Sequence, residues 1–247
     1  MDKVRVSCVS YLNSKPFLFG LTNHPINSKL ELVLDHPKDC ARKLISHQAD
    51  IGLVPVASLR EIPNHQIISN KCIGSDGPVA SVMLFSQVPV EDISEIFLDY
   101  QSMTSVQLCR ILCKEHWNIN PVFIQAEPGY ENRIVGTTAG VIIGDRALEL
   151  NKAYSYQYDL PEVWKSWTGL PFVFACWASN RILDEAFLEM FEESLQFGLN
   201  HMDDVISQVK KSHPKLANHV EAYYKEHLCF EMHEAHRRGL ALFLSKL

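Results

Sequence analysis

The chain has 247 residues, of which 47% are hydrophobic and 21% are charged, the proportions of a globular protein rather than of a fibrous or disordered one. Lys and Arg number 23 against 29 Asp and Glu, so the formal net charge is −6, and no run of basic residues is longer than two. A protein that binds nucleic acid needs a basic face to neutralise phosphates. The composition therefore argues against a nucleic-acid partner.

The sequence also argues against a membrane partner. Its longest apolar stretch, residues 170–178, is far shorter than the roughly 20 residues that cross a bilayer. Strand-like sequence starts at Val4 without a charged leader and apolar segment before it, so we expect a cytoplasmic protein. The seven cysteines, an odd number, favour reduced thiols.

The first part of the chain alternates strands and helices. A 3.6-residue apolar period predicts a helix over residues 37–47, and a loop passes into a short helix within residues 12–21. The expected strands are residues 4–9, 30–34 and 50–55. This order of elements predicts a parallel sheet with helices on both faces.

A second unit of the same kind follows. Its expected strands are residues 96–99, 121–124 and 140–143, and its expected helices are residues 104–116 and 145–150. Residues 79–85 and 171–178 are expected to be extended crossings, and the chain from Asn180 onward to be all helical. The sequence thus predicts an α/β protein with two hinged lobes and a ligand cleft between them. Lobe one would be residues 1–84 plus 179–247, and lobe two residues 85–178.

Ligands of such sheets bind beyond the carboxyl ends of the strands, where this sequence carries hydroxyl and amide side chains. A helix that begins near Ser14, with Pro16 in its first turn, would aim free N–H groups into the cleft. After the strand that ends at Asp99, Ser102 or Thr104 either caps the next helix or belongs to a second anion site. Two helix starts that face each other across a cleft suit an anion with two carboxylates.

Two further positions are ambiguous. Ser81 interrupts an apolar strand, so its hydroxyl is either structurally neutral or faces a ligand on the floor of the cleft. Gly144 ends a strand and Asp145 starts a helix. The first interpretation of Asp145 is a helix cap, and a ligand contact is the second.

Familiar catalytic and cofactor motifs are absent. The sequence has no Gly-x-Gly-x-x-Gly loop, no Gly-Lys-Ser/Thr loop and no Gly-x-Ser-x-Gly elbow. His233 and His236 are three residues apart rather than four, without an obvious third ligand, and are interpreted as a solvated helix face. Cys109 and Cys113 fit a buried helix stripe. We therefore expect no metal, no cofactor and no catalytic histidine.

Four segments taken together, in order along the chain, resemble the chorismate dehydratases of the futalosine route to menaquinone. They are residues 10–16 (Ser-Tyr-Leu-Asn-Ser-Lys-Pro), 50–56, 143–148 and 158–175. The pattern Tyr-Leu-Asn-x-Lys-Pro separates them from the related 1,4-dihydroxy-6-naphthoate synthases. The resemblance implies a type 2 periplasmic-binding-protein-like fold and chorismate as substrate. It also implies the removal of water from chorismate to give 3-[(1-carboxyvinyl)oxy]benzoate.

On this resemblance we expect Asn13 and Ser81 to be catalytic and to donate hydrogen bonds near the reacting carbons. The expected substrate-binding residues are Ser10, Tyr11, Val56, Ser102, Thr104, Ser105, Gly144 and Asp145, and Ser10, Thr104 and Ser105 are expected to hold carboxylates. Because no side-chain base stands out, our hypothesis is that the enolpyruvyl carboxylate of chorismate takes the proton. Two alternatives remain, a non-catalytic cytoplasmic protein that binds small anions and the naphthoate synthase.

Overall fold

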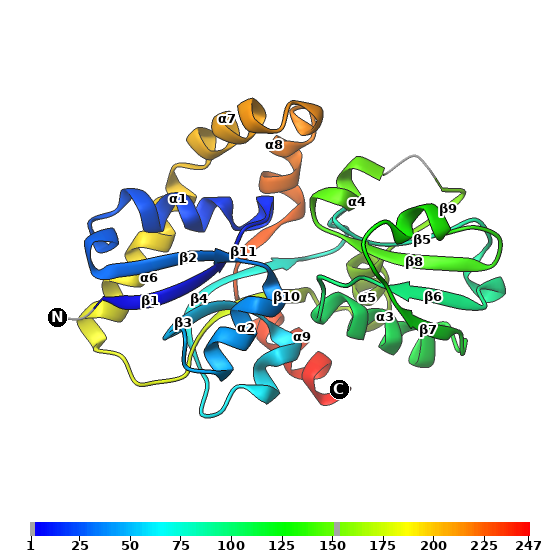
Figure 1. Ribbon diagram of the computed structural model, residues 1–247, viewed down its shortest axis with the longest axis horizontal. Coiled ribbons are helices and arrows are strands. Elements are labelled where there is room, and N and C mark those ends of the chain that lie inside the picture. The colour runs from blue at the N-terminus through cyan, green and yellow to red at the C-terminus, as the bar shows by residue number, and fades with distance from the viewer. Residues whose placement is uncertain (1–2, 151–153) are drawn as a thin grey trace.

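The computed structural model describes residues 3–150 and 154–247, which form two β-sheets that lie side by side with helices around them (Figure 1). The first sheet has the strand order β11-β4-β10-β3-β1-β2 and the second the order β7-β6-β8-β5-β9. No helix in the described ranges has the length and apolar character needed to cross a membrane.

The sequence predicts a parallel first sheet, and this prediction is wrong, because the sheet is mixed. Its strands are β1 (Val4–Val9), β2 (Leu30–Asp35), β3 (Ile51–Pro55), β4 (Gln66–Ser75), β10 (Phe172–Ser179) and β11 (Cys229–Glu231). β1 is parallel to β2 and β3, with Val6 opposite Leu32, but β10 is antiparallel to both β3 and β4. The order of local elements misses this because β10 enters the first sheet from the second sheet, by way of α5 (Leu160–Thr168), and not from a neighbouring strand of its own sheet.

The second sheet is mixed as well. Its strands are β5 (Val82–Ser86), β6 (Glu95–Leu98), β7 (Val122–Gln125), β8 (Thr138–Ile143) and β9 (Tyr156–Asp159). β6 is parallel to β7 and β8, whereas β5 runs antiparallel to β8 and β9. The parallel strands β6 and β8 bring the residues after Leu98 and Ile143 to the same edge of this sheet.

Helices cover both sheets (Figure 1). They are α1 (Lys15–Asn23), α2 (Pro37–Ile45), α3 (Thr104–Glu115), α4 (Asp145–Leu150), α5 (Leu160–Thr168), α6 (Glu185–Asn200), α7 (Met202–Ser212), α8 (Val220–Ala222) and α9 (Glu234–Ser245). α1 lies against α6 at Gly20 and Gly198, where any Cβ atom would collide with the backbone of the other helix. This close contact fixes the N-terminal segment on the C-terminal helices.

Strand pairing shows that the chain passes between the two sheets at other residues than the sequence predicts. β5 belongs to the second sheet and β10 to the first, so the connections between the sheets are residues 76–81 and 160–171 rather than 79–85 and 171–178. The expected lobe boundaries, 84/85 and 178/179, would cut these two strands. We propose instead that the lobes divide within the two connections. The C-terminal part is not all helical, because β11, too short to show a period in the sequence, extends the first sheet.

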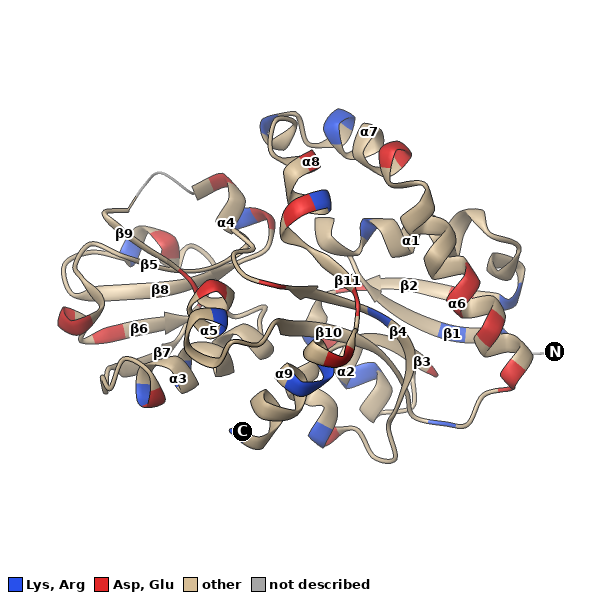
Figure 2. Ribbon diagram, turned by 180° about the vertical axis from the view of Figure 1, so that it is seen from behind, with Lys and Arg blue, Asp and Glu red and all other residues tan. Residues whose placement is uncertain are grey.

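One cluster of buried apolar side chains runs through both lobes, from Val6 in β1 to Leu84 in β5 and Leu112 in α3. Figure 2 shows Lys and Arg interspersed with Asp and Glu along the elements of both lobes. This continuous core holds the two sheets together, and the site described next lies between them.

Candidate active site

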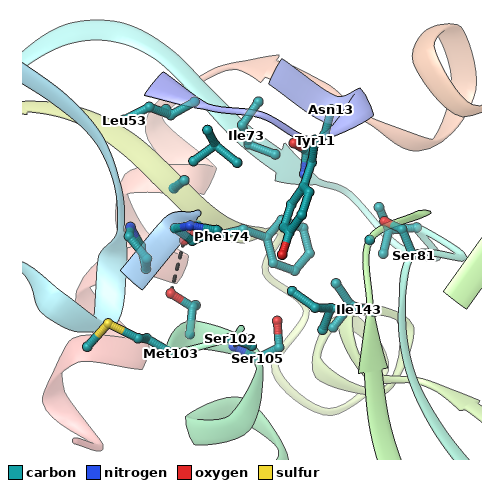
Figure 3. A pocket seen from close by; sticks show the side chains of 18 of the residues that line it. Tyr11, Asn13, Leu53, Ile73, Ser81, Ser102, Met103, Ser105, Ile143 and Phe174 are labelled. Carbon is teal, nitrogen blue, oxygen red and sulfur yellow. Dashed lines mark hydrogen bonds between the residues drawn. The ribbon is translucent and has the colours of Figure 1, made fainter. Parts of the chain in front are cut away.

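A pocket lies between the two sheets, with about 600 Å³ of empty space, part of which is open to solvent. Its polar lining comes from the loop after β1, the connection before β5, the start of α3 and the end of β8. Seven of the residues expected from the sequence line it: Tyr11, Asn13, Ser81, Ser102, Thr104, Ser105 and Gly144. Figure 3 shows Asn13 and Ser105 on opposite sides of the pocket, with the ring of Tyr11 between them. Much of the remaining wall is apolar.

Three expected residues lie outside this lining. The amide of Ser10 donates to the carbonyl oxygen of Asp35, which keeps that residue at the end of the β1–β2 pair. The side chain of Val56 is completely buried at the start of a 3-10 turn. Asp145 does not show its expected cap interaction among the hydrogen bonds of the described residues. Its carboxylate accepts a hydrogen bond from the amide of Leu12 at 3.4 Å, a contact between the lobes.

Asn13 brings an unpaired polar atom to the pocket. It lies in a 3-10 turn, Leu12–Ser14, and the buried Ser14 hydroxyl fixes the turn by lying 2.5 Å from the carbonyl oxygen of Val9 and 2.8 Å from that of Tyr11. The Oδ1 atom of Asn13 is buried without a partner among the described residues. A buried acceptor left without a donor costs about 1–3 kcal/mol, so this oxygen is suited to a ligand. The first residues of α1 do not line the pocket, so the loop, and not the expected helix start, presents the polar groups.

Ser81 is nearly buried, with 3% of its surface exposed, and lies just before β5. Its hydroxyl oxygen accepts a hydrogen bond from the Tyr223 hydroxyl at 3.0 Å. Its carbonyl oxygen accepts from the amide of Gly144 at 2.8 Å. The side chain and the backbone of Ser81 are therefore both fixed at the edge of the pocket.

The residue before Ser81 has an uncommon backbone conformation. Ala80 has φ = 60°, in the left-handed region that residues other than glycine rarely adopt. The Asp159 carboxylate accepts hydrogen bonds from the amides of Val79 at 2.8 Å and Ala80 at 2.6 Å, and from the amide of Glu162 in α5. Burial raises the pKa of Asp159 to about 6. This carboxylate thus links the first turn of α5 to the conformation of the segment that carries Ser81.

The start of α3 supplies the donors on the opposite side. The Ser102 hydroxyl oxygen accepts from the amide of Ser105 at 3.1 Å, so Ser102 satisfies an amide in the first turn of α3, and its proton stays free to donate. The hydroxyl of Thr104 donates to the carbonyl oxygen of Phe174 at 3.0 Å. Because Thr104 has only one hydroxyl proton, its hydroxyl does not fit the expected role of holding a carboxylate. Of the first amides of the helix, that of Ser105 is used by Ser102, and that of Thr104 has no recorded acceptor among the described residues.

Tyr11 connects the lobes beside this helix. Its hydroxyl donates to the Gln101 side-chain oxygen at 2.6 Å, and the same oxygen accepts from Arg146 at 3.2 Å. Burial raises the pKa of Asp99, which Arg146 opposes through an ion pair at 2.5 Å. Burial also raises the pKa of Tyr11, so its phenol remains a donor at neutral pH. Arg146, half-buried and paired with the buried Asp99, therefore fixes the acceptor that Tyr11 uses.

Tyr11 is the one ionisable side chain in the described lining, which has no Asp, Glu, His, Lys, Arg or Cys. The lining thus has no side-chain base suited to neutral pH. Within residues 3–150 and 154–247, no group of three or more His, Cys, Asp or Glu is placed to hold a metal ion. The expected solvated helix face holds for His233, which is exposed, but His236 is buried.

Sequence reasoning missed Tyr223 and Tyr224. Both are 2% exposed and lie in a π-helix, Tyr223–His227. The Tyr224 hydroxyl donates to the carbonyl oxygen of Leu12 at 2.6 Å, next to Asn13. Two adjacent aromatic residues after an apolar helix turn signal burial, but nothing in the sequence relates them to positions 142 and 212 residues away.

Two mixed sheets with a pocket between them define a periplasmic-binding-protein-like fold, and solved structures agree. A protein of Archaeoglobus fulgidus is 14% identical with a TM-score of 0.72, covering 99% of this chain and 96% of its own. A Candida albicans protein, described as having the generic periplasmic binding protein fold, is 12% identical with a TM-score of 0.64, covering 99% of this chain and 90% of its own. At these identities the likeness establishes the fold alone.

The chain belongs to the menaquinone biosynthesis family, whose model matches residues 4–247. A relative from Thermus thermophilus, named chorismate dehydratase, is 28% identical over 226 residues, which cover 82% of this chain and 76% of the relative. The family expected from the four sequence segments is thereby confirmed.

Proposed function

We propose that this protein is a chorismate dehydratase, a hydro-lyase that converts chorismate into 3-[(1-carboxyvinyl)oxy]benzoate and water. The family match and the name of the Thermus thermophilus relative support the proposal. The structural observation that carries it is a pocket with hydroxyl and amide groups on facing sides and no side-chain base suited to neutral pH in its described lining. Such a pocket suits a substrate that supplies its own base.

The reaction requires little from the protein. The C3 proton of chorismate is acidic because the electrons left behind delocalise through the ring double bond onto the C1 carboxylate. Those electrons then form the C3–C4 double bond, the C4–O bond breaks, and the hydroxyl leaves with a proton as water. The ring becomes aromatic. The protein must hold the ring, stabilise the charge that gathers on the C1 carboxylate and exclude water.

The donors are distributed in a way that suits this reaction. Ser102, Ser105 and the first amides of α3 are placed to bind one carboxylate at the positive end of the helix dipole. Ser81 and Asn13 come from other segments and are assigned to the reacting carbons. Asn13 has an unpaired oxygen, so it can accept a hydrogen bond from the C4 hydroxyl as well as donate one.

The base in this proposal is the enolpyruvyl carboxylate of the substrate. The described lining has no cation that would pair with it, and apolar residues such as Ile73 and Phe174 form much of the wall. A carboxylate that loses water without gaining an ion pair has a raised pKa and becomes a stronger base. An analogue without this carboxylate should bind but not lose water. If the analogue is dehydrated, the substrate carboxylate is not the base.

The direct test is incubation of the purified protein with chorismate, followed by ultraviolet absorbance and by mass spectrometry for the loss of one water. We expect the enolpyruvyl-oxybenzoate to accumulate, and a sample of protein treated with a chelator to react at the same rate. A double variant, Asn13→Ala with Ser81→Ala, serves as the inactive control. Recovery of bound chorismate unchanged would mean a carrier or sensor on this fold, and absence of binding would remove chorismate as the ligand.

A cytoplasmic location is part of the proposal. All seven cysteines are free thiols, and six of them are buried, which suits a reducing compartment. Fractionation of cells that produce the full-length protein, with detection by antibody, tests the location. Recovery outside the cytoplasm would contradict it.

A further inference from the structure

We propose that Tyr223 is a positioning residue of the pocket, which directs the hydroxyl proton of Ser81 toward the substrate. The catalytic part of this inference rests on the proposed dehydratase function. The contact between Tyr223 and Ser81 does not rest on it.

The hydrogen-bond geometry gives the direction of the proton. The Tyr223 hydroxyl donates to Ser81 Oγ at 3.0 Å. A serine hydroxyl has one proton and two lone pairs, so an oxygen that accepts from Tyr223 has to send its own proton elsewhere. No acceptor for that proton is recorded among the described residues, and Ser81 lines the pocket. The Ser81 proton is therefore free for a ligand oxygen.

Packing alone does not explain why a hydroxyl group is present at position 223. The side chain is 2% exposed, and a buried phenol must find a partner or lose the hydrogen bonds it makes to water. Phenylalanine would fill the same volume without this requirement. Burial raises the pKa of Tyr223, so the phenol keeps its proton and remains a donor throughout the neutral range.

The surrounding backbone supports the same role. Tyr223 and Tyr224 are consecutive residues of a π-helix, a rare form that is frequent at functional sites. One donates to Ser81 and the other to the carbonyl oxygen of Leu12. A single turn of the C-terminal segment thus holds both segments that carry the proposed catalytic side chains, Ser81 and Asn13.

The kinetic test uses Tyr223→Phe, which removes the hydroxyl alone. Ser81 then loses the donor that orients it, and we expect kcat for chorismate to fall on the order of tenfold, the loss of about one hydrogen bond, with KM changed less than twofold. In a protein that already carries Ser81→Ala, the same substitution should leave kcat unchanged. A purely structural role would lower kcat by the same factor in both backgrounds, and that result would overturn the proposal.

Tyr158→Phe is the matched control. The Tyr158 hydroxyl accepts a hydrogen bond from the amide of Val90 at 2.8 Å and does not line the pocket, so its loss should leave kcat unchanged. An equal fall in kcat for this variant would show that the loss of any partly buried tyrosine hydroxyl has this effect, which would overturn the assignment to Tyr223.

A measurement without substrate separates the contact from the proposed function. The free energies of unfolding of Tyr223→Phe, Ser81→Ala and the double variant form a double-mutant cycle. We expect the two effects to be non-additive, since each variant breaks the same hydrogen bond. Additive effects would overturn the contact. If the cycle shows coupling but the wild-type protein does not dehydrate chorismate, the proposed function fails and the orientation of Ser81 stands.

Discussion

The carboxylate of Asp159 lies 2.6 Å from the amide nitrogen of Ala80 and accepts its hydrogen bond, while Ala80 has φ = 60°. A residue other than glycine in the left-handed region costs about 1–2 kcal/mol, so it persists only when its surroundings hold it there. Asp159, at the end of β9 and the N-cap position of α5, stabilises this conformation by accepting the hydrogen bond. The position of Ser81 therefore depends on a carboxylate that does not itself line the pocket.

Removing that carboxylate should affect both stability and turnover. We expect Asp159→Ala to lower the free energy of unfolding by about 1–3 kcal/mol, because buried amides lose their acceptor, and to lower kcat because Ser81 shifts. Urea denaturation and the chorismate assay measure the two effects. Asp184→Ala, which removes the exposed cap of α6, should cost about 1 kcal/mol and leave kcat unchanged. Full activity in Asp159→Ala would contradict the link to Ser81.

Asn13 offers a test of the pocket itself. Removing a well-placed hydrogen-bonding group from an active site costs on the order of a hundredfold in kcat, and we expect that loss for Asn13→Ala in the chorismate assay. The fold should survive, since the Asn13 oxygen has no partner to lose among the described residues. Asn23→Ala, on the exposed end of α1, is the control and should keep full activity. Unchanged turnover in Asn13→Ala would remove this residue from the site.

Gly144 tests the wall formed by Tyr11. Its φ is 65°, and an added Cβ would lie 3.7 Å from the Tyr11 ring. Gly144→Ala should cost about 1–2 kcal/mol of stability from backbone strain and also raise KM, because the new methyl group restrains the ring. Gly136→Ala carries similar strain, with φ of 59°, but its Cβ meets open space, so KM should not change. Equal KM values for the two variants would mean that Tyr11 does not limit binding.

Lowering the pH should reduce the free energy of unfolding because Asp50 becomes protonated. Burial alone would raise the pKa of Asp50, but hydrogen bonds from Arg5 and the charge of Arg181 hold that pKa below its usual value. The native state then binds fewer protons than the unfolded state. The stabilisation by Asp50 is therefore complete above the ordinary carboxyl pKa of about 3.9 and is lost as the pH falls through the lower native value.

The free energy of unfolding, measured in urea from pH 7 to pH 3, tests this direction of the pH dependence. The advantage of wild type over Asp50→Asn should shrink at the acid end. Asp39→Asn, which breaks an exposed pair with Arg42, should cost less than about 1 kcal/mol at pH 7. A difference between wild type and Asp50→Asn that does not change with pH would contradict the assignment.

Local pattern was sufficient for many elements. β1 and α4 have the bounds that apolar period and turn residues predicted, and α3 ends one residue before the prediction. β4 was missed because its sequence contains Asn70, Lys71 and Gly74, which strands disfavour. It is a strand because β10 and β11 pair with its two edges, and that pairing is not visible in a local segment.

In the site, too, local sequence predicts some residues, whereas others depend on contacts between distant parts of the chain. Ser102 and Gly144 could be predicted because both follow strands, and ligands of α/β sheets bind beyond strand ends. Val56 follows a strand too, but a 3-10 turn directs its side chain into the core. Tyr223 follows no strand of the pocket. It reaches Ser81 from 142 residues further along the chain, through a π-helix that no sequence pattern announces.

The long separation between Ser81 and Tyr223 also has a consequence during translation. The strands of the second sheet precede residue 160, whereas Tyr223 and Tyr224 are made more than 60 residues later. At about 5–20 residues per second, a ribosome needs several seconds to go from the last strand of the second sheet to Tyr223. Both sheets can begin to pair in that interval, yet the hydroxyl of Ser81 still lacks its donor. A nascent chain should therefore pair much of both sheets before the hydroxyl of Ser81 is oriented by its donor.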